Sequence, residues 1–115
     1  MHIDISGLRI DLTDALHDHV NTEFKKFEKI LDPSARIVVE IGKTTDHHKQ
    51  GDIFKAEGRI IEPKAEYFAN IVSEDLYTAI NSLSDELFQQ VTESKSRHRT
   101  LLKRGRGMIK RLLRL

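Results

Sequence analysis

The stretch that decides the fold is residues 74–91, EDLYTAINSLSDELFQQV. Its apolar residues recur at spacings of four, three, four and four, which is the period of one face of an α-helix. This stripe consists of Leu76, Ile80, Leu83, Leu87 and Val91, flanked by Tyr77 and Phe88. No large apolar residue occurs from Thr92 to Thr100, so we expect the core to end near Val91. Beyond that point the helix either projects from the domain or frays.

Four segments before this helix alternate apolar and polar residues, which predicts strands with one buried face. They are residues 2–10, 36–43, 53–61 and 66–73. Between the first two, residues 13–31 form a second amphipathic helix, with Thr13 as its N-cap and Asp32-Pro33 as its end. The apolar stripe of this second helix consists of Leu16, Val20, Phe24, Phe27 and Leu31.

The resulting order, β-α-β-β-β-α, predicts an α+β two-layer sandwich. We expect a four-stranded sheet with the two helices side by side on one face and solvent on the other. The first two strands would be parallel if adjacent, because a helix connects them, and the last three would form an antiparallel meander.

The distribution of charge divides the chain after Ser94. The whole chain of 115 residues carries a net charge of +1, but residues 1–94 hold 10 Lys or Arg against 18 Asp or Glu, a net charge of −8. Residues 95–115 hold nine Lys or Arg and no acid. We therefore expect one domain at 1–94 and a basic extension at 95–115, made of the end of the helix and a flexible or amphipathic tail.

Such a basic segment is typical of proteins that bind polyanions, because cations displace counterions from phosphates. The cations of this segment, together with a patch of three lysines on the first helix, are the candidate RNA-binding residues. They are Lys25, Lys26, Lys29, Lys95, Arg97, Arg99, Lys103, Arg104, Arg106, Lys110, Arg111 and Arg114. A tail that only confers solubility is the plainer interpretation.

Other chemistry finds little support in the sequence. There is no cysteine, and adjacent histidines such as His47 and His48 in a polar loop lack the spacing that zinc prefers. Gly105-Arg106-Gly107 lacks the strand and helix context of a phosphate-binding loop and indicates instead a flexible break in the basic segment. We expect no catalytic residue, metal, cofactor or small-molecule substrate. Neither a membrane-spanning run nor a signal-peptide pattern is present, which favours a cytoplasmic location.

Two stretches resemble a known family. Residues 74–87 with Gln90 and Val91 resemble the second-helix signature of the ribosome hibernation-promoting factors, which include protein Y and are also labelled sigma-54 modulation proteins. Residues 2–7, 12–16 and 24–28 are similar to the same family. The resemblance spans about residues 1–97.

The resemblance implies a monomeric protein that occupies the decoding channel of the small ribosomal subunit, contacts its rRNA, and blocks messenger and tRNA binding under stress or in stationary phase. It implies the short form, without the C-terminal dimerisation domain of the long form. Lys26, Lys95 and Arg97 lie at positions that are usually basic in the family motifs. Where the second-helix motif usually has Lys or Arg, this chain has Glu86, Gln89 and Glu93, so we expect the tail to carry more of the binding.

Alternatives from other classes remain open. Met108, Ile109, Leu112 and Leu113 alternate with basic residues, a pattern also typical of an adaptor that lies on a membrane surface. Another kind of RNA-binding adaptor would fit the same charge distribution. An enzyme is the third class, and it would require a histidine beside a carboxylate in a cleft.

Overall fold

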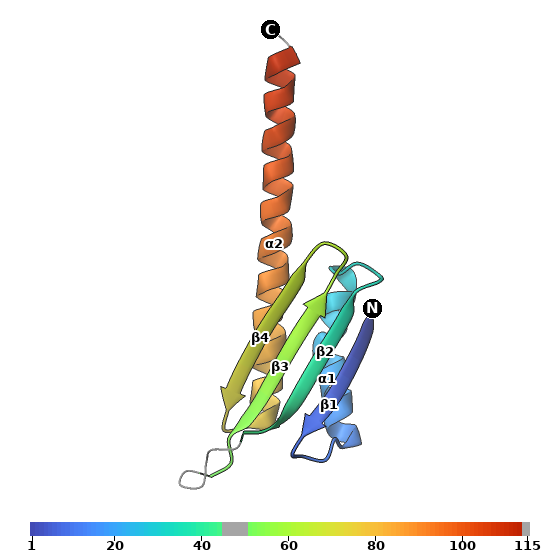
Figure 1. Cartoon of the computed structure of the whole chain (residues 1–115), viewed down its shortest axis with the longest axis vertical. Helices are drawn as coiled ribbons and strands as arrows, with labels where there is room; N and C mark the ends of the chain where they lie inside the picture. Colours follow the sequence, from blue (N-terminus) through green and yellow to red (C-terminus); the bar gives the residue numbers. More distant parts are fainter. Residues whose placement is uncertain (45–50, 114–115) are drawn as a thin grey trace.

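The computed structural model describes the backbone of residues 1–44 and 51–113 and the side chains of residues 1–44 and 51–98. Within this part of the chain a sheet of strands is covered on one face by helices (Figure 1). The elements are β1 (His2–Leu8), α1 (Asp14–Phe24), the 3-10 helix η1 (Lys25–Lys29), β2 (Arg36–Lys43), β3 (Phe54–Ile61), β4 (Glu66–Ser73) and α2 (Leu76–Leu113). The predicted α+β fold and element order are therefore confirmed.

The sheet has the strand order β1-β2-β3-β4. β1 pairs with β2 in parallel, with Ile3 opposite Ile37 and Ile5 opposite Val39. β2, β3 and β4 pair antiparallel, and Arg36 lies opposite Ile61. The turn between β3 and β4 therefore lies at the same end of the sheet as the start of β2.

The core lies between the sheet and the two helices. All five residues of the α2 stripe are buried, and Val91 is the last buried residue among the described side chains, as predicted. The stripe packs with residues from α1, η1 and the inner face of the sheet, including Val20, Phe24, Phe27, Ile37, Val39, Ile41, Ala56 and Ile60. Ser84 is buried too, and its hydroxyl donates to the carbonyl oxygen of Glu23 at 2.9 Å, which joins α2 to α1.

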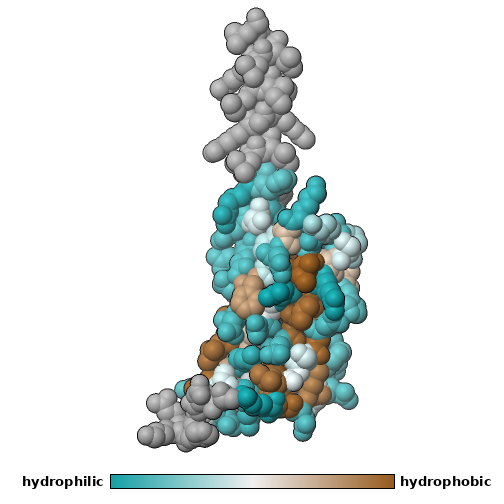
Figure 2. All heavy atoms as spheres, viewed as in Figure 1, coloured by the Kyte–Doolittle hydropathy of each residue, from teal (hydrophilic) through white to brown (hydrophobic). Residues whose placement is uncertain are grey.

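The outer face of the sheet is exposed, and apolar and hydrophilic side chains are mixed on it (Figure 2). Ile61, Phe68 and Val72 are exposed apolar residues of β3 and β4. The guanidinium of Arg59 lies 5.8 Å from the centre of the Phe68 ring and also pairs with Glu66 at 3.4 Å. This face carries both signs of charge, so it is not a uniformly basic surface.

Two predicted boundaries are wrong. β1 ends at Leu8 rather than Ile10, because Arg9 adopts a left-handed backbone conformation with φ of 58°, which interrupts the extended chain. The helix predicted over 13–31 is instead an α-helix as far as Phe24, followed by η1. Phe24 and Phe27 are three residues apart and both fully buried, and a 3-10 helix of three residues per turn brings both rings to the same face.

α2 continues beyond the sheet as a single helix (Figure 1). Of the two outcomes expected after Val91, the helix projects rather than frays. The flexible break expected at Gly105-Arg106-Gly107 is wrong, since the helix runs through both glycines to Leu113. A glycine in a helix costs only about 1 kcal/mol relative to alanine, and no proline is present to interrupt the backbone hydrogen bonds.

Candidate nucleic-acid interface

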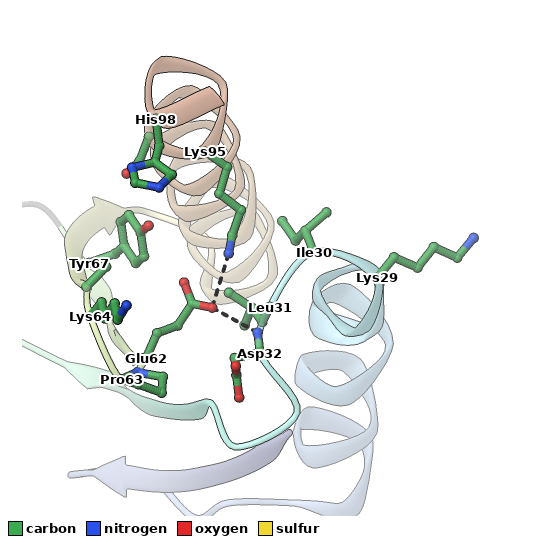
Figure 3. Close-up of a pocket in the computed structure, with 12 residues that line it drawn as sticks. Lys29, Ile30, Leu31, Asp32, Glu62, Pro63, Lys64, Tyr67, Lys95 and His98 are labelled. Carbon is green, nitrogen blue, oxygen red and sulfur yellow. Dashed lines mark hydrogen bonds and ion pairs between the residues drawn. The ribbon is translucent and has the colours of Figure 1, made fainter. Parts of the chain in front are cut away.

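Three segments far apart in sequence meet where α2 leaves the sheet. They are the end of η1 with the loop that follows it, the β3–β4 turn, and residues 94–98 of α2. Together they line an open groove of about 810 Å³, drawn in Figure 3. The connections explain this meeting, because η1 leads back to the start of β2 at the sheet end where β3 turns into β4.

The groove has an apolar part and a basic part. Its apolar part is formed by Ile30, Leu31, Pro63, Ala65 and Tyr67. Its basic part is formed by Lys64, Lys95 and His98, while Lys29 lies at its edge with its ammonium directed away from Glu62 and Lys95 (Figure 3). A surface of this composition can contact an apolar group and an anion at the same time.

Glu62 and Asp32 also line the groove, but their carboxylates are already hydrogen-bonded within the protein. The side chain of Glu62 is only 7% exposed, and its Oε2 accepts from the backbone N–H of Asp32 at 2.8 Å and from Lys95 Nζ at 3.2 Å (Figure 3). Asp32 accepts from the hydroxyl and the backbone N–H of Ser34, at 2.6 and 2.9 Å. The hydroxyl bond is the largest cause that lowers the pKa of Asp32. Lys95 is therefore held in place at the base of the projecting helix.

Of the predicted binding residues, Lys95 lies in the groove and Lys29 lies at its edge, with its ammonium directed away from Lys95 (Figure 3). Lys25 is exposed at the start of η1, four residues before Lys29. Lys26 lies against α2, since its Nζ pairs with Asp85 at 3.0 Å and lies 5.0 Å from the centre of the Phe88 ring. Arg97 is largely exposed and lies 3.6 Å from Glu93 on the preceding turn of α2.

The remaining predicted cations lie further along the chain. The structure describes only the backbone for Arg99, Lys103, Arg104, Arg106, Lys110 and Arg111, all of which belong to α2. Arg114 lies outside the described residues, as do His47 and His48.

Two basic residues of the groove, Lys64 and His98, were not predicted from the sequence. Lys64 follows Pro63 in a turn, where a single lysine gives no local signal. It could have been found only by noting that the turn and the start of β2 share one end of an antiparallel pair. His98 lies three residues after Lys95, so the helical period places both on one side of α2.

The described residues include no group of three or more histidine, cysteine, aspartate or glutamate side chains able to hold a metal. Within the same part of the chain, no helix is both long enough and apolar enough to cross a membrane. His19 of α1 makes a hydrogen bond to Asn81 of α2, with 2.7 Å between Nε2 and Oδ1, and so helps to join the two helices.

The fold matches solved structures over most of their length. The N-terminal domain of protein Y from Thermus thermophilus superimposes with a TM-score of 0.70 at 24% identity, over 81% of this chain and 98% of that domain. A ribosomal subunit interface protein from Coxiella burnetii gives a TM-score of 0.67 at 18% identity, over 84% of this chain and 99% of the other. These matches establish the fold and define a small α+β domain of the βαβββα class.

Sequence comparison gives the family. Residues 3–99 match the model described as Sigma 54 modulation protein / S30EA ribosomal protein. The ribosome hibernation promoting factor of Azotobacter vinelandii is 36% identical over 98 residues, which cover 84% of this chain and 85% of that protein. The factor of the same name from Escherichia coli K12 is 29% identical over 99 residues, 84% of this chain and 96% of the relative. The chain belongs to this family, which confirms the resemblance and the prediction of a non-enzymatic protein.

Proposed function

We propose that this protein is a ribosome hibernation factor that binds the small subunit in its decoding channel and prevents messenger and tRNA from binding there. Its partner would be the rRNA of that subunit, its location the cytoplasm, and its working form a monomer. Relatives over most of the chain carry the name ribosome hibernation promoting factor, which supports this function.

The observation that carries the proposal is the meeting of cations from three segments at the end of the domain where α2 leaves it. Residues 1–94 are acidic overall, with a net charge of −8, so rRNA would repel most of the domain. At the groove, by contrast, Lys29, Lys64 and Lys95 adjoin the basic continuation of α2. Phosphates would therefore approach this end of the domain. In this proposal residues 1–94 are the folded domain, and residues 95–115 are its basic extension.

Co-sedimentation tests the proposal directly. The protein should sediment with isolated small subunits and with whole ribosomes, but not with isolated large subunits. Saturating protein should also displace messenger and initiator tRNA from the small subunit. Preferential binding to large subunits, or full occupancy without loss of either ligand, would contradict the proposed site.

A further inference from the structure

We propose that the groove at the base of the projecting helix binds one unstacked nucleotide of RNA. The base would lie on the apolar side chains and the adjoining phosphate against the lysines. This inference rests on the proposed rRNA partner and adds to it the chemical group that the groove recognises.

The basic part of the groove is available to an anion. Lys64 is exposed, and within the described ranges it makes no ion pair. Lys95 uses one contact on Glu62, but its ammonium has three protons to donate, and its side chain is 37% exposed. Glu62 also lines the groove, but its Oε2 is bound by the backbone N–H of Asp32 and by Lys95, which offsets part of its repulsion of a phosphate.

The apolar part favours a nucleotide over a bare phosphate. Ala65 and Ile30 line the groove and are partly exposed, and the largely buried Tyr67 forms part of its wall. An inorganic anion would leave the exposed part of this apolar surface in contact with water. RNA loops present unpaired bases that lie on aromatic or apolar surfaces while their phosphates meet cations. A volume of about 810 Å³ is in the range of small-ligand sites, so the groove suits one nucleotide rather than a duplex.

NMR titration of the full-length protein tests the base and the phosphate separately. The probes are a short oligouridine and an inorganic polyphosphate, which has phosphates but no bases. We expect the Lys64 amide to shift with both probes, and the Ala65 methyl and Tyr67 ring protons to shift with oligouridine alone. If all three signals shift equally with both probes, the groove binds phosphate and does not recognise a base. If no signal shifts with either probe, the groove binds no nucleotide and the proposal is wrong.

A matched pair of variants tests the groove on the ribosome. Lys64→Ala removes a cation in the groove, whereas Lys43→Ala removes one at the opposite end of the sheet, where it pairs with Asp52 at 3.3 Å. Lys64→Ala should weaken small-subunit binding about three- to fivefold, as expected for one exposed ion pair. It should also make the slope of log K against log salt less steep by about 1, with Lys43→Ala unchanged.

The outcomes separate the two proposals. Wild-type protein that fails to bind small subunits would refute the proposed function, whatever the titrations with oligouridine give. Wild-type binding that Lys64→Ala and Lys43→Ala reduce equally, or not at all, would refute the groove while leaving the proposed function in place.

Discussion

Gly42 and Gly58 lie where the backbone approaches other atoms too closely for a larger residue. A Cβ at Gly42 would overlap the backbone carbonyl of Leu8 on the neighbouring strand. A Cβ at Gly58 would lie 2.8 Å from the Cδ1 tip of Leu87, which has some freedom to move. We predict that both substitutions to alanine are destabilising, by about 1–3 kcal/mol for an overpacked site, and that Gly42→Ala costs more. Urea unfolding measures both, and a smaller effect at Gly42 would contradict the register of β1 and β2.

Asp75 gives the protein a predictable response to acid. Its carboxylate accepts from the hydroxyl of Thr78 at 2.7 Å and from its backbone N–H at 2.9 Å, and these bonds, the hydroxyl first, lower the pKa of Asp75. The stabilisation is therefore complete above about pH 4, the ordinary value for an unfolded aspartate, and is lost as the pH falls through the lower folded value. We predict that Asp75→Asn reduces the loss of stability between about pH 5 and pH 2, measured by thermal unfolding. If Asp75→Asn loses as much stability as the wild type over this pH range, then protonation of Asp75 is not coupled to unfolding.

A residue's role can be predicted from the sequence where the signal is local. Thr13 was predicted as an N-cap from its place before an apolar stripe, and its hydroxyl accepts from the N–H of Leu16 at 3.2 Å. The contact of Lys95 with Glu62 could not be predicted in this way, because the two residues are 33 positions apart and meet only through the fold. The candidate groove depends on such meetings, so only Lys29 and Lys95 were named in advance.

Among the elements, α2 contributes most directly to the core. Leu83 and Leu87 are fully buried at the centre of its stripe. We predict that Leu83→Ala or Leu87→Ala lowers the free energy of unfolding by about 2–5 kcal/mol, through lost burial and the cavity left behind. Gln89→Ala, on the exposed side of the same helix, is the control and should change little. An unchanged thermal midpoint in either leucine variant would mean that the stripe faces solvent.

The basic end of α2 should supply much of the affinity for RNA. If about five of the nine cations in residues 95–115 engage phosphates, log K should fall against log salt with a slope of roughly −3 to −4.5. We predict that a chain ending at Thr100 binds small subunits more weakly and with a shallower slope than the full chain. Equal affinities and slopes would favour a tail that only confers solubility. Liposome binding lost on truncation, with ribosome binding retained, would favour the membrane-surface alternative.

Periodicity predicted β2 and β4 well because buried residues alternate with more exposed ones along most of each strand. β2 and β4 begin and end at the predicted residues. The switch from α1 to η1 was missed, since a spacing of three between Phe24 and Phe27 is compatible with either helix type. The continuation of α2 through Gly105 and Gly107 was not predicted, because the two glycines were expected to end the helix. A glycine weakens a helix without necessarily ending it.

For the whole molecule, the fold places opposite charges in different regions. Acidic residues are spread over the domain, whereas the cations of η1, the β3–β4 turn and α2 converge at one end. Composition indicated this division along the sequence but not in space, because the positions of Lys29 and Lys64 depend on the strand order. This separation of charge would orient the protein on a polyanion, so that the end with the groove faces the polyanion.

The length of α2 has a consequence for how the protein opens. Up to Val91 the helix is packed into the core, so its amides should exchange with solvent only when the whole domain unfolds. Past the sheet the same helix depends chiefly on its own backbone hydrogen bonds, and a segment of that length is marginally stable in water. Hydrogen–deuterium exchange should therefore divide one continuous helix into a slow part and a fast part near Lys95. Binding to a partner would slow amide exchange in the fast part of the helix. Protection there would therefore report that the partner is bound, without a chemical tag on the protein.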